Sequence, residues 1–448
     1  MNRVEYALAH ATETKALRIG AGILPQTGEL FKELFPGCRA IIVADPTTFR
    51  VAGEDVQKSL TEAGVAQDTP HIFTAPDLHA EWTYVEELDA VLKNTNAIPV
   101  AVGLGTINDL TKLCSHRNGR RYMVVGTAAS MDGYTSFGAS ITFEGAKQTF
   151  SCPAPLGVLA DTAIIAAAPK EMTASGYADL FAKIPAGADW IISDALGVEP
   201  LDERAFSIVQ DGLQDALGDP EGVRHGTIET IEPLIEGLML GGFAMQAHQS
   251  SRPASGADHQ FSHLWNMEHH TMADGHTPSH GFQVSIGLLA STAYYEQFLK
   301  SDIVNLDLDI EAAVAAWPDQ AEAERYALEL YAGTDFPEIG LKETRAKYID
   351  KDQLRVQLTT LKNNWPEIKA RLEKQIVPFD EATRRLRIVG APTLPEEIGI
   401  SRERMKASVI RAQHIRRRFT ILDVAVRTNL LDQWTNAIFG PGGVWEIK

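Results

Sequence analysis

Histidines are concentrated in one short stretch of this 448-residue chain, where they could bind a metal ion or transfer protons. Seven of the thirteen lie between residues 248 and 280. Neutral imidazole is a common metal ligand, and its charge changes near physiological pH. His259 and His263 are four residues apart and would share one face of a helix, so their spacing does not decide which of them is a ligand. A single histidine is more often structural, but the cluster as a whole favours a site.

The segment lacks the His-Glu-x-x-His pattern, which argues against a zinc peptidase. A carboxylate ligand must therefore come from elsewhere, and Asp179 is the candidate because it lies in the apolar segment 174–184. An unpaired charge in such surroundings is unfavourable, and a metal ion would compensate it. Pairing with Lys183, one helical turn later, would compensate it equally well. The residues alone leave both explanations open.

A glycine turn at residues 100–109, Val-Ala-Val-Gly-Leu-Gly-Thr-Ile-Asn-Asp, indicates a second kind of chemistry. An apolar run enters a Gly-x-Gly-Thr turn and a helical pattern follows. The glycines would permit positive φ and close backbone approach, while the helix N-terminus would offer N–H groups to a phosphate. Asn108 replaces the third glycine of the dinucleotide fingerprint, so a tight turn without a ligand is an equal alternative for this motif alone.

Two more polar sites follow predicted strands. Asp45 comes after the apolar run 40–44, where a carboxylate can accept hydrogen bonds from a ribose, although a turn or helix cap before Pro46 explains it as well. The hydroxyl-rich segment 126–136, which contains Asp132, follows another apolar run. Ligands of open α/β sheets bind beyond the carboxyl ends of strands, so three such ends together favour a nucleotide cofactor.

The elements that position these groups fall into two halves. Short β-branched runs alternate with helical patterns such as 84–94 in the first half, which predicts a mainly parallel sheet. These runs lie at residues 40–44, 98–102, 122–125 and 157–165.

After about residue 169 the pattern becomes helical, as in the apolar stripe 231–239. Further helical stretches are predicted at residues 309–333, 351–374 and 401–430, with loops at residues 218–226 and 250–258. We therefore predict an α/β domain at residues 1–168 and an all-α domain at residues 169–448.

Composition narrows the function classes. The net charge of −18 opposes binding to nucleic acid, and no apolar run reaches the roughly 18 residues of a membrane span. Three widely spaced cysteines suggest neither a disulfide framework nor a thiolate zinc site, so we expect a cytoplasmic protein. The basic run of Arg411, Arg416, Arg417 and Arg418 favours a solvated helix face or an intersubunit contact over a polyanion site.

The ordered motifs resemble the sn-glycerol-1-phosphate dehydrogenases of the iron-type, metal-dependent polyol dehydrogenase superfamily. Five segments carry this resemblance: Gly-Leu-Gly-Thr-Ile-Asn-Asp at 103–109, Thr-Ala-Ala-Ser-Met-Asp-Gly at 127–133, Gly-Tyr-Ala-Asp at 176–179, Ser-Gly-Ala-Asp-His at 255–259 and His-Gly-Phe-Gln-Val at 280–284. It implies a dehydroquinate synthase-like fold of the iron-type alcohol dehydrogenases, with a Rossmann-like α/β domain followed by an all-α domain. Leu104 stands where a further glycine is common, and Asp258 where glutamate is frequent.

The resemblance also implies roles for individual residues. Asp179, His259 and His280 would hold one divalent metal ion, which the ligand types allow to be zinc, nickel or iron. His263 would be a proton carrier on the substrate side, and Asp132 would face the substrate. The residues expected to bind NAD(P)H are Asp45, Gly105, Thr106, Ile107, Asn108, Asp109, Thr127, Ser130 and Ser136.

The implied activity is the reduction of dihydroxyacetone phosphate to sn-glycerol 1-phosphate by NAD(P)H, and its reverse, in glycerophospholipid-type metabolism. The substrate would be a small phosphorylated three-carbon compound, and the resemblance implies a homodimer. A glycerol or other polyol dehydrogenase would share every metal ligand and differ in phosphate recognition. A sensor that binds nucleotide and metal without catalysis is the alternative from another class.

Overall fold

The computed structural model describes residues 2–76, 78–103, 105–144 and 146–448, so Leu104 lies outside the described residues. The chain divides into two compact units, each made of separate segments. Unit 1 comprises residues 1–180 and 207–251, and unit 2 comprises residues 181–206 and 252–448. The division into domains at residues 168 and 169 stays a prediction.

Unit 1 is built on a parallel sheet of six strands in the order β1-β8-β5-β4-β2-β3. The strands are β1 (Ala16–Gly20), β2 (Ala40–Ala44), β3 (His71–Ile72), β4 (Ile98–Gly103), β5 (Met123–Gly126) and β8 (Gly157–Asp161). The predicted α/β class with a mainly parallel sheet is confirmed, and three of the four predicted strands match to within one residue at each end.

The order of the strands reverses beside β2. The chain passes from β2 outward to β3 and then returns to the other side of β2 as β4, after which β5 pairs with β4. Gly103 at the end of β4 is the register partner of Gly126 at the end of β5. The carboxyl ends of β2, β4 and β5 are thus neighbours at a topological switch point, the place where open α/β sheets bind ligands.

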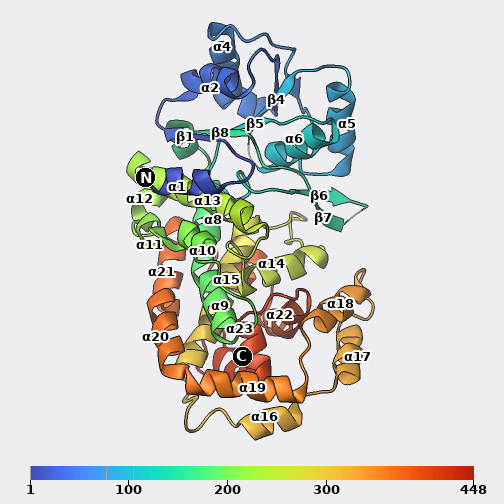
Figure 1. Cartoon of the computed structure of the whole chain (residues 1–448), viewed down its shortest axis with the longest axis vertical. Coiled ribbons are helices and arrows are strands. Elements are labelled where there is room, and N and C mark those ends of the chain that lie inside the picture. The colour runs from blue at the N-terminus through green and yellow to red at the C-terminus, as the bar shows by residue number, and fades with distance from the viewer. Residues whose placement is uncertain (1, 77, 104, 145) are drawn as a thin grey trace. The chain divides into compact units, whose positions relative to one another are not determined.

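Helices cover both faces of this sheet (Figure 1). Alternate strand residues such as Ile42, Val100 and Val125 share a buried core with side chains of α2 (Thr27–Leu34) and α4 (Glu54–Glu62). On the other side, α5 (Trp82–Leu92) packs on α6 (Gly105–Arg117), and α6 packs on β4. Every residue of β2 is buried, as expected for a parallel strand covered on both faces.

Two details of unit 1 differ from the sequence prediction. The predicted strand 157–165 ends at Asp161, whose carboxylate accepts a hydrogen bond of 3.0 Å from Ala163 N and so begins helix α7 (Thr162–Ala166). The same carboxylate accepts backbone N–H groups of Gly22 and Leu24, which fixes the end of β8. A hairpin of β6 (Ala139–Phe143) and β7 (Ala146–Phe150), which was not predicted, precedes β8.

The later segment of unit 1 is helical. The predicted stripe 231–239 lies in α13 (Ile228–His248), and its five apolar residues are fully buried. The loop predicted at 218–226 is wrong in part, because it contains α12 (Pro220–His225). Asp219 caps this short helix by accepting a hydrogen bond of 2.9 Å from Gly222 N, and Gly226 ends it with a φ of 75°.

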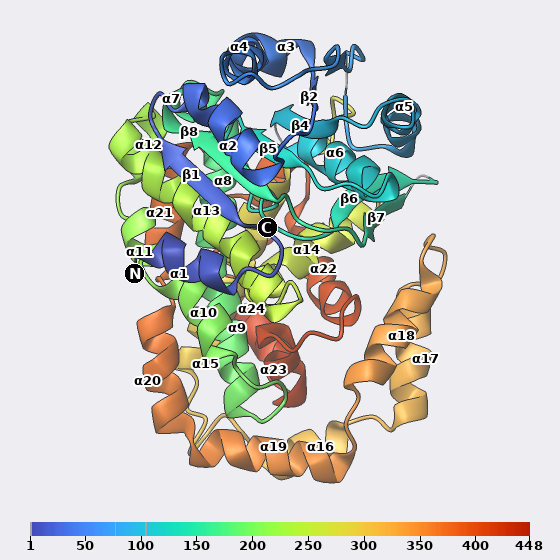
Figure 2. The same ribbon diagram turned by 45° about the horizontal axis from the view of Figure 1, so that its top comes forward.

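The regular elements of unit 2 among its described residues are all helices. Its central helices are α9 (Lys183–Ala195), α14 (Ala257–Met267), α15 (His280–Lys300), α22 (Arg402–His414) and α23 (Ile421–Arg427), and α14 packs against both α15 and α22. The remaining helices include α16 (Ile310–Ala316), α17 (Gln320–Leu330), α18 (Pro337–Lys347), α19 (Lys351–Asn363), α20 (Trp365–Gln375), α21 (Phe379–Val389) and α24 (Leu431–Phe439). Helices α17 and α18 lie side by side as a hairpin (Figure 2).

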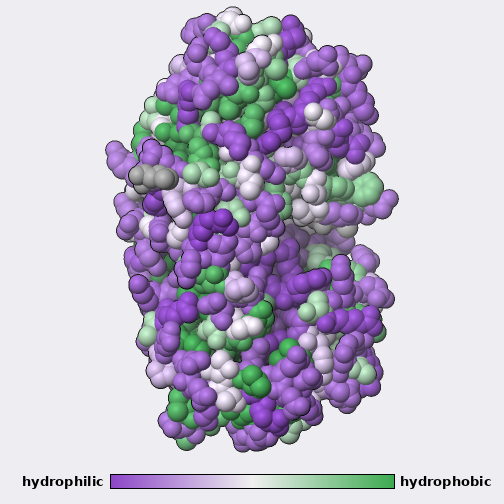
Figure 3. Space-filling view, in the orientation of Figure 1, coloured by the Kyte–Doolittle hydropathy of each residue, from purple (hydrophilic) through white to green (hydrophobic). Residues whose placement is uncertain are grey.

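Each of the three long helical stretches predicted for unit 2 is in fact two helices. The stretch 309–333 breaks at Pro318, and the stretch 401–430 is interrupted by a linker at residues 415–420. The face of the molecule drawn in Figure 3 is mostly hydrophilic, with apolar side chains scattered in small groups. Within the described ranges, no helix has the length and apolarity needed to cross a membrane.

Candidate functional site

The first candidate group lies at the switch point of unit 1 and begins with Asp45, directly after β2. Its Oδ1 accepts hydrogen bonds from Thr47 N at 2.8 Å and Thr48 N at 2.9 Å, so the cap before Pro46 is present. The other carboxylate oxygen, Oδ2, has no hydrogen-bond partner among the described residues. The cap and the expected ribose contact are therefore compatible, because each uses a different oxygen.

The glycines of the glycine turn are needed for close packing and do not adopt unusual dihedral angles. Neither Gly103 nor Gly105 has a positive φ. A Cβ added to Gly103 would lie 2.7 Å from the Cβ of Ile107, and one added to Gly105 would lie 2.9 Å from the sulfur of Met131. Helix α6 begins at Gly105, so its first N–H groups emerge at the carboxyl end of β4. A phosphate could bind to these N–H groups.

Two residues expected to bind the cofactor have side chains engaged within unit 1. Asn108 accepts a hydrogen bond of 2.7 Å from the hydroxyl of Tyr122, and its amide donates to the carbonyl of Gly133 at 3.4 Å. Asp109 lies 3.3 Å from the ammonium of Lys112 and accepts the backbone N–H of Ser140. Ile107 is buried against Gly103, and Thr106 is half-buried. Backbone groups of this turn are therefore better placed for a cofactor than most of its side chains.

Lys112 is a residue that the sequence analysis missed. Its buried ammonium donates hydrogen bonds to the carbonyls of Gly133 at 3.3 Å and Gly138 at 2.9 Å. These bonds, together with the ion pair to Asp109, attach the hydroxyl-rich loop to α6. A lysine within an apolar helical segment was the only sequence signal for this role.

The hydroxyl-rich loop follows β5 and includes Thr127, Ser130 and Ser136. Thr127 is buried, and the hydroxyl of Ser130 lies 3.3 Å from that of Tyr134. Ser136 donates to the carbonyl of Gly133 at 3.1 Å, which closes a turn within the loop. Thr127 directly follows β5, and Ser130 and Ser136 lie further along the same loop.

The same loop is attached to α8 (Lys170–Phe181), which carries Asp179. The backbone N–H of Asp132 donates to Oδ2 of Asp179 at 2.9 Å, and Ser175 donates to the carbonyl of Ser130 at 3.1 Å. A Cβ at Gly176 would lie 2.1 Å from the carbonyl oxygen of Ala129, so glycine is required for this approach. Asp179 is fully buried, and its carboxylate is oriented by the loop that carries Asp132.

The histidines of unit 2 lie on α14 and at the start of α15. The ring of His259 lies 5.3 Å from that of His280 and 6.3 Å from that of His263, centroid to centroid. The Nδ1 atom of His259 is hydrogen-bonded to the carboxylate of Asp258. A carboxylate on one ring nitrogen orients the imidazole and makes the other nitrogen a better metal ligand, so Nε2 of His259 is the candidate ligand atom.

His280 has a similar but weaker support. Its Nδ1 lies 3.4 Å from the hydroxyl of Ser262, which is also 3.4 Å from Oε1 of Gln283. Asp258 and Ser262 are groups that the sequence analysis did not assign, although both stand within three residues of His259. No sequence signal marked them for this role, which depends on contacts made in the folded chain.

Asp179, His259 and His280 form a group in which each side chain offers one ligand atom, and these atoms all lie within 4.8 Å of one another. It is the one such group found among the described residues, and His263 is not part of it. One carboxylate and two imidazoles suit zinc, nickel or ferrous iron. Three protein ligands also leave coordination positions for a substrate.

A buried carboxylate supports the helix that carries His259. Asp189 on α9 accepts hydrogen bonds of 2.7 Å each from Ala257 N, Ile421 N and the hydroxyl of Tyr295. A Cβ at Gly256 would lie 2.3 Å from this carboxylate, which explains the glycine before α14. Burial raises the pKa of Asp189 to about 7, because the charged form loses its hydration.

Comparisons with known proteins identify relatives of this chain. Residues 18–169 match the family described as iron-containing alcohol dehydrogenase. A Bacillus velezensis protein named glycerol-1-phosphate dehydrogenase (NAD(P)+) is 32% identical over 327 residues, which cover 70% of this chain and 82% of the relative. The Bacillus licheniformis protein of the same name is 29% identical over 361 residues, with 79% and 89% covered.

Solved structures of similar fold are more distant in sequence. A probable glycerol dehydrogenase from Sinorhizobium meliloti has a TM-score of 0.58 at 18% identity and covers 95% of this chain and 98% of its own. Glycerol dehydrogenase from Schizosaccharomyces pombe has a TM-score of 0.59 at 16% identity, with 95% and 91% covered. These similarities concern the fold.

Proposed function

The chain belongs to the iron-containing alcohol dehydrogenase family, and we propose that within it the protein is a metal-dependent glycerol-1-phosphate dehydrogenase. The proposed reaction is the reduction of dihydroxyacetone phosphate to sn-glycerol 1-phosphate by NAD(P)H, and its reverse. The observation that carries the proposal is identity of about 30% over most of the chain to relatives with that name. The Asp179, His259 and His280 group supports metal dependence.

The three ligands would hold one divalent cation. When bound, such an ion stabilises negative charge that develops on a substrate oxygen. Asp258 keeps the His259 ring in a fixed orientation, and Ser262 does the same for His280. The loop N–H of Asp132 fixes the Asp179 carboxylate. All three ligands are therefore oriented by a hydrogen bond to another residue, which is the usual arrangement in protein metal sites.

The dinucleotide would bind at the switch point of the sheet. We assign its phosphates to the backbone N–H groups at the start of α6 and its ribose to Oδ2 of Asp45. A carboxylate in that position disfavours the 2′-phosphate of NADP, so we expect a preference for NADH. When bound, the nicotinamide supplies the hydride. Thr127, Ser130 and Ser136 would line the adjacent loop, and their hydroxyls could orient the nicotinamide end.

His263 is the proposed proton carrier. It stands one helical turn after His259 on α14, is half-buried, and is outside the ligand group. A side chain in this role typically contributes about 10²- to 10⁴-fold to the rate. Asp132, next to the metal aspartate, would face the substrate.

The second candidate is a glycerol or polyol dehydrogenase, since two proteins of similar fold are named a probable glycerol dehydrogenase and a glycerol dehydrogenase. The test is to measure NADH and NADPH oxidation by the purified protein with dihydroxyacetone phosphate and with dihydroxyacetone, with the metal content determined by elemental analysis. We expect kcat/KM for the phosphorylated ketone to be at least ~10²-fold higher, since a phosphate bound through charge-assisted hydrogen bonds contributes several kcal/mol. The product should be the sn-1 enantiomer.

Equal or better turnover of dihydroxyacetone would replace the proposal with a polyol dehydrogenase. An sn-3 product would leave phosphate recognition intact and refute the stereochemistry. The absence of coenzyme oxidation with any carbonyl compound, in protein that contains its metal, would favour a sensor.

A further inference from the structure

Asp189 of α9 lies where two other helices of unit 2 begin. Its Oδ2 accepts a hydrogen bond of 2.7 Å from the N–H of Ala257, the first residue of α14. Its Oδ1 accepts one of 2.7 Å from the N–H of Ile421, the first residue of α23. The first N–H groups of a helix have no acceptor within the helix, and a carboxylate beside them is favourable. One side chain therefore caps both helices.

The start of α14 needs this cap because the residue before the helix, Gly256, has no side chain that could accept its N–H groups. A Cβ at Gly256 would lie 2.3 Å from Oδ2 of Asp189 and 2.9 Å from Oδ1 of Asp258, so glycine leaves room for both carboxylates. Asp258 is bonded to the ring of His259. Asp189 thus caps the same turn of α14 that carries this metal ligand and the residue that orients it.

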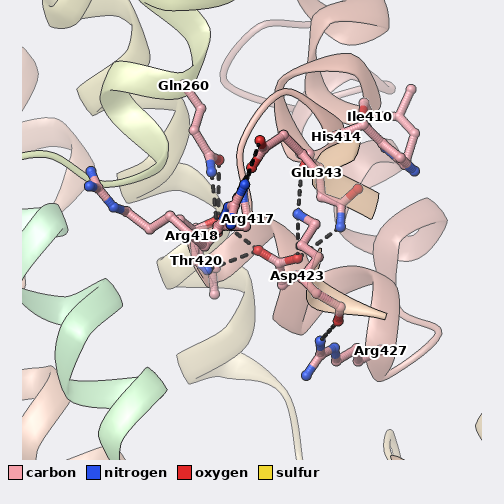
Figure 4. A network of polar contacts seen from close by, with 12 residues as sticks. Gln260, Glu343, Ile410, His414, Arg417, Arg418, Thr420, Asp423 and Arg427 are labelled. Atoms are coloured by element: carbon pink, nitrogen blue, oxygen red, sulfur yellow. Dashed lines mark hydrogen bonds and ion pairs between the residues drawn. The ribbon is translucent and has the colours of Figure 1, made fainter. Parts of the chain in front are cut away.

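The linker before α23, residues 415–420, is attached to the same part of α14 (Figure 4). The guanidinium of Arg418 donates to the carbonyl of Ser255 at 2.7 Å, and Gln260 donates to the carbonyl of Arg418 at 3.3 Å. Arg417, by contrast, is exposed and forms an ion pair of 3.0 Å with Glu343. The solvated position predicted for the basic run is therefore found at Arg417, whereas Arg418 is half-buried and fixes the linker to α14.

Asp189 accepts a third hydrogen bond of 2.7 Å from the hydroxyl of Tyr295, and it is fully buried. A carboxylate accepts from all three donors, whereas the amide of an asparagine would turn N–H groups toward at least one of them. Burial raises the pKa of Asp189 to about 7, and the neighbouring Asp258 adds to this effect. Because the charge is costly to bury, stability alone is a weak reason for it, and precise placement of the attached helices is a better one.

We propose that Asp189 is a positioning residue of the metal site, which fixes the first turn of α14 against α23 and thereby places His259. A ligand that is displaced by a fraction of an ångström binds its ion less tightly, and residues that orient ligands contribute about 10- to 100-fold to metal affinity. The inference rests on the proposed function only through its metal ligands and is independent of the substrate.

The test is the affinity for Zn²⁺, measured by competition with a chromophoric chelator. In Asp189→Asn the dissociation constant should rise by about 10- to 100-fold. Asp194→Asn is the matched control, because this half-buried carboxylate of α9 also accepts a backbone N–H, that of Leu201 at 3.0 Å. Its affinity should match that of the wild type. Unchanged affinity in folded Asp189→Asn protein would overturn the proposal.

A further variant separates positioning from general stability. Tyr295→Phe removes one donor to Asp189 but leaves both helix caps in place. It should lower the thermal unfolding midpoint without changing the affinity for Zn²⁺. An equal loss of affinity in Tyr295→Phe and Asp189→Asn would show that Asp189 acts only through the stability of the core, and the proposal would fail.

A second measurement uses the wild-type protein alone. Because coupling between two sites is reciprocal, Zn²⁺ binding should slow amide hydrogen exchange in the first turn of α14 and also in that of α23, which carries none of the three ligands. Exchange in α17 is the reference and should not change. Protection of α14 without protection of α23 would contradict the proposal, even if Asp189→Asn does not fold.

The outcomes distinguish this inference from the proposed function. If the affinity for Zn²⁺ depends on Asp189 but dihydroxyacetone phosphate is not reduced, the positioning role stands and the proposed substrate fails. If dihydroxyacetone phosphate is reduced and Asp189→Asn binds Zn²⁺ as tightly as the wild type, the proposed function stands and the positioning role fails.

Discussion

The two candidate sites of this protein are made of different chemical groups. At the switch point of unit 1, the groups available to a ligand are mostly backbone N–H groups and one carboxylate oxygen, and the glycines make room for them. On α14 and α15 of unit 2, the groups are imidazole side chains, and each is oriented by a second side chain. A site made of backbone is sensitive to added volume, whereas a site made of side chains is sensitive to the loss of a single functional group.

The largest effect should come from removing a ligand. We expect His280→Ala to lose its metal and to lower kcat/KM by at least ~10³-fold, since a Lewis acid contributes several kcal/mol to the barrier. Coenzyme binding, measured by nucleotide fluorescence, should be retained. His276→Ala, an exposed histidine four residues earlier, is the control and should keep both metal and activity. Full metal content and turnover in His280→Ala would refute the ligand assignment.

Added volume at the carboxyl end of β4 should weaken stability and coenzyme binding while leaving metal binding intact. In Gly103→Ala the new methyl would meet the Cβ of Ile107, which cannot rotate away, so we expect the free energy of unfolding to fall by about 1–3 kcal/mol. KM for the coenzyme should rise while metal content stays unchanged. Gly126→Ala is the matched control for stability, because this register partner has no atom within 4 Å of an added Cβ. If Gly103→Ala lost metal instead, the two sites would not be separable in this way.

The smallest predicted effect concerns pH and the side-chain network of unit 2. Burial, assisted by Lys347, lowers the pKa of His414 from its ordinary 6.5 to about 4. The folded state therefore favours the neutral ring. Its contribution to the free energy of unfolding is present above about pH 6.5 and is lost as the pH falls toward 4, with ~2 kcal/mol lost at pH 5. Urea unfolding of wild type and His414→Gln at pH 7 and pH 5 would measure this. The variant should have a smaller pH dependence, whereas His276→Gln should match wild type.

Sequence reasoning identified the helices and strands that are determined by local sequence patterns. The strand at residues 40–44 was predicted to the residue, because a buried parallel strand is a continuous apolar run. Helix α12 was missed because its cap residues, Asp219 and Gly226, are of types that are as common in turns as at the ends of helices. The break of the predicted helix 401–430 contains neither proline nor glycine, and its local signal is the pair of Thr420 and Asp423, in which the backbone N–H of Thr420 donates to the Asp423 carboxylate at the start of α23. It depends on contacts of Arg417 and Arg418 with residues distant in sequence.

The candidate site likewise contains some residues that the sequence predicted and others that it could not. The motifs selected Asp179, His259 and His280, whereas spacing alone could not separate His259 from His263. The groups that orient the ligands were invisible at that stage, because Asp258, Ser262 and the N–H of Asp132 have this role only in the folded chain. Residues that bind through tertiary contacts are not readable from local patterns.

Asp189 has a consequence for how the protein folds. Its carboxylate is on α9, yet it accepts the N–H of Ile421, 232 residues later in the chain. During synthesis this carboxylate must stay hydrated until α14, α15 and α23 have all emerged, because burying it earlier would leave it without donors. Unit 2 is also interrupted by residues 207–251, which belong to unit 1. Formation of its core is therefore a late, non-local event, and contacts of such long sequence separation are expected to make folding slow.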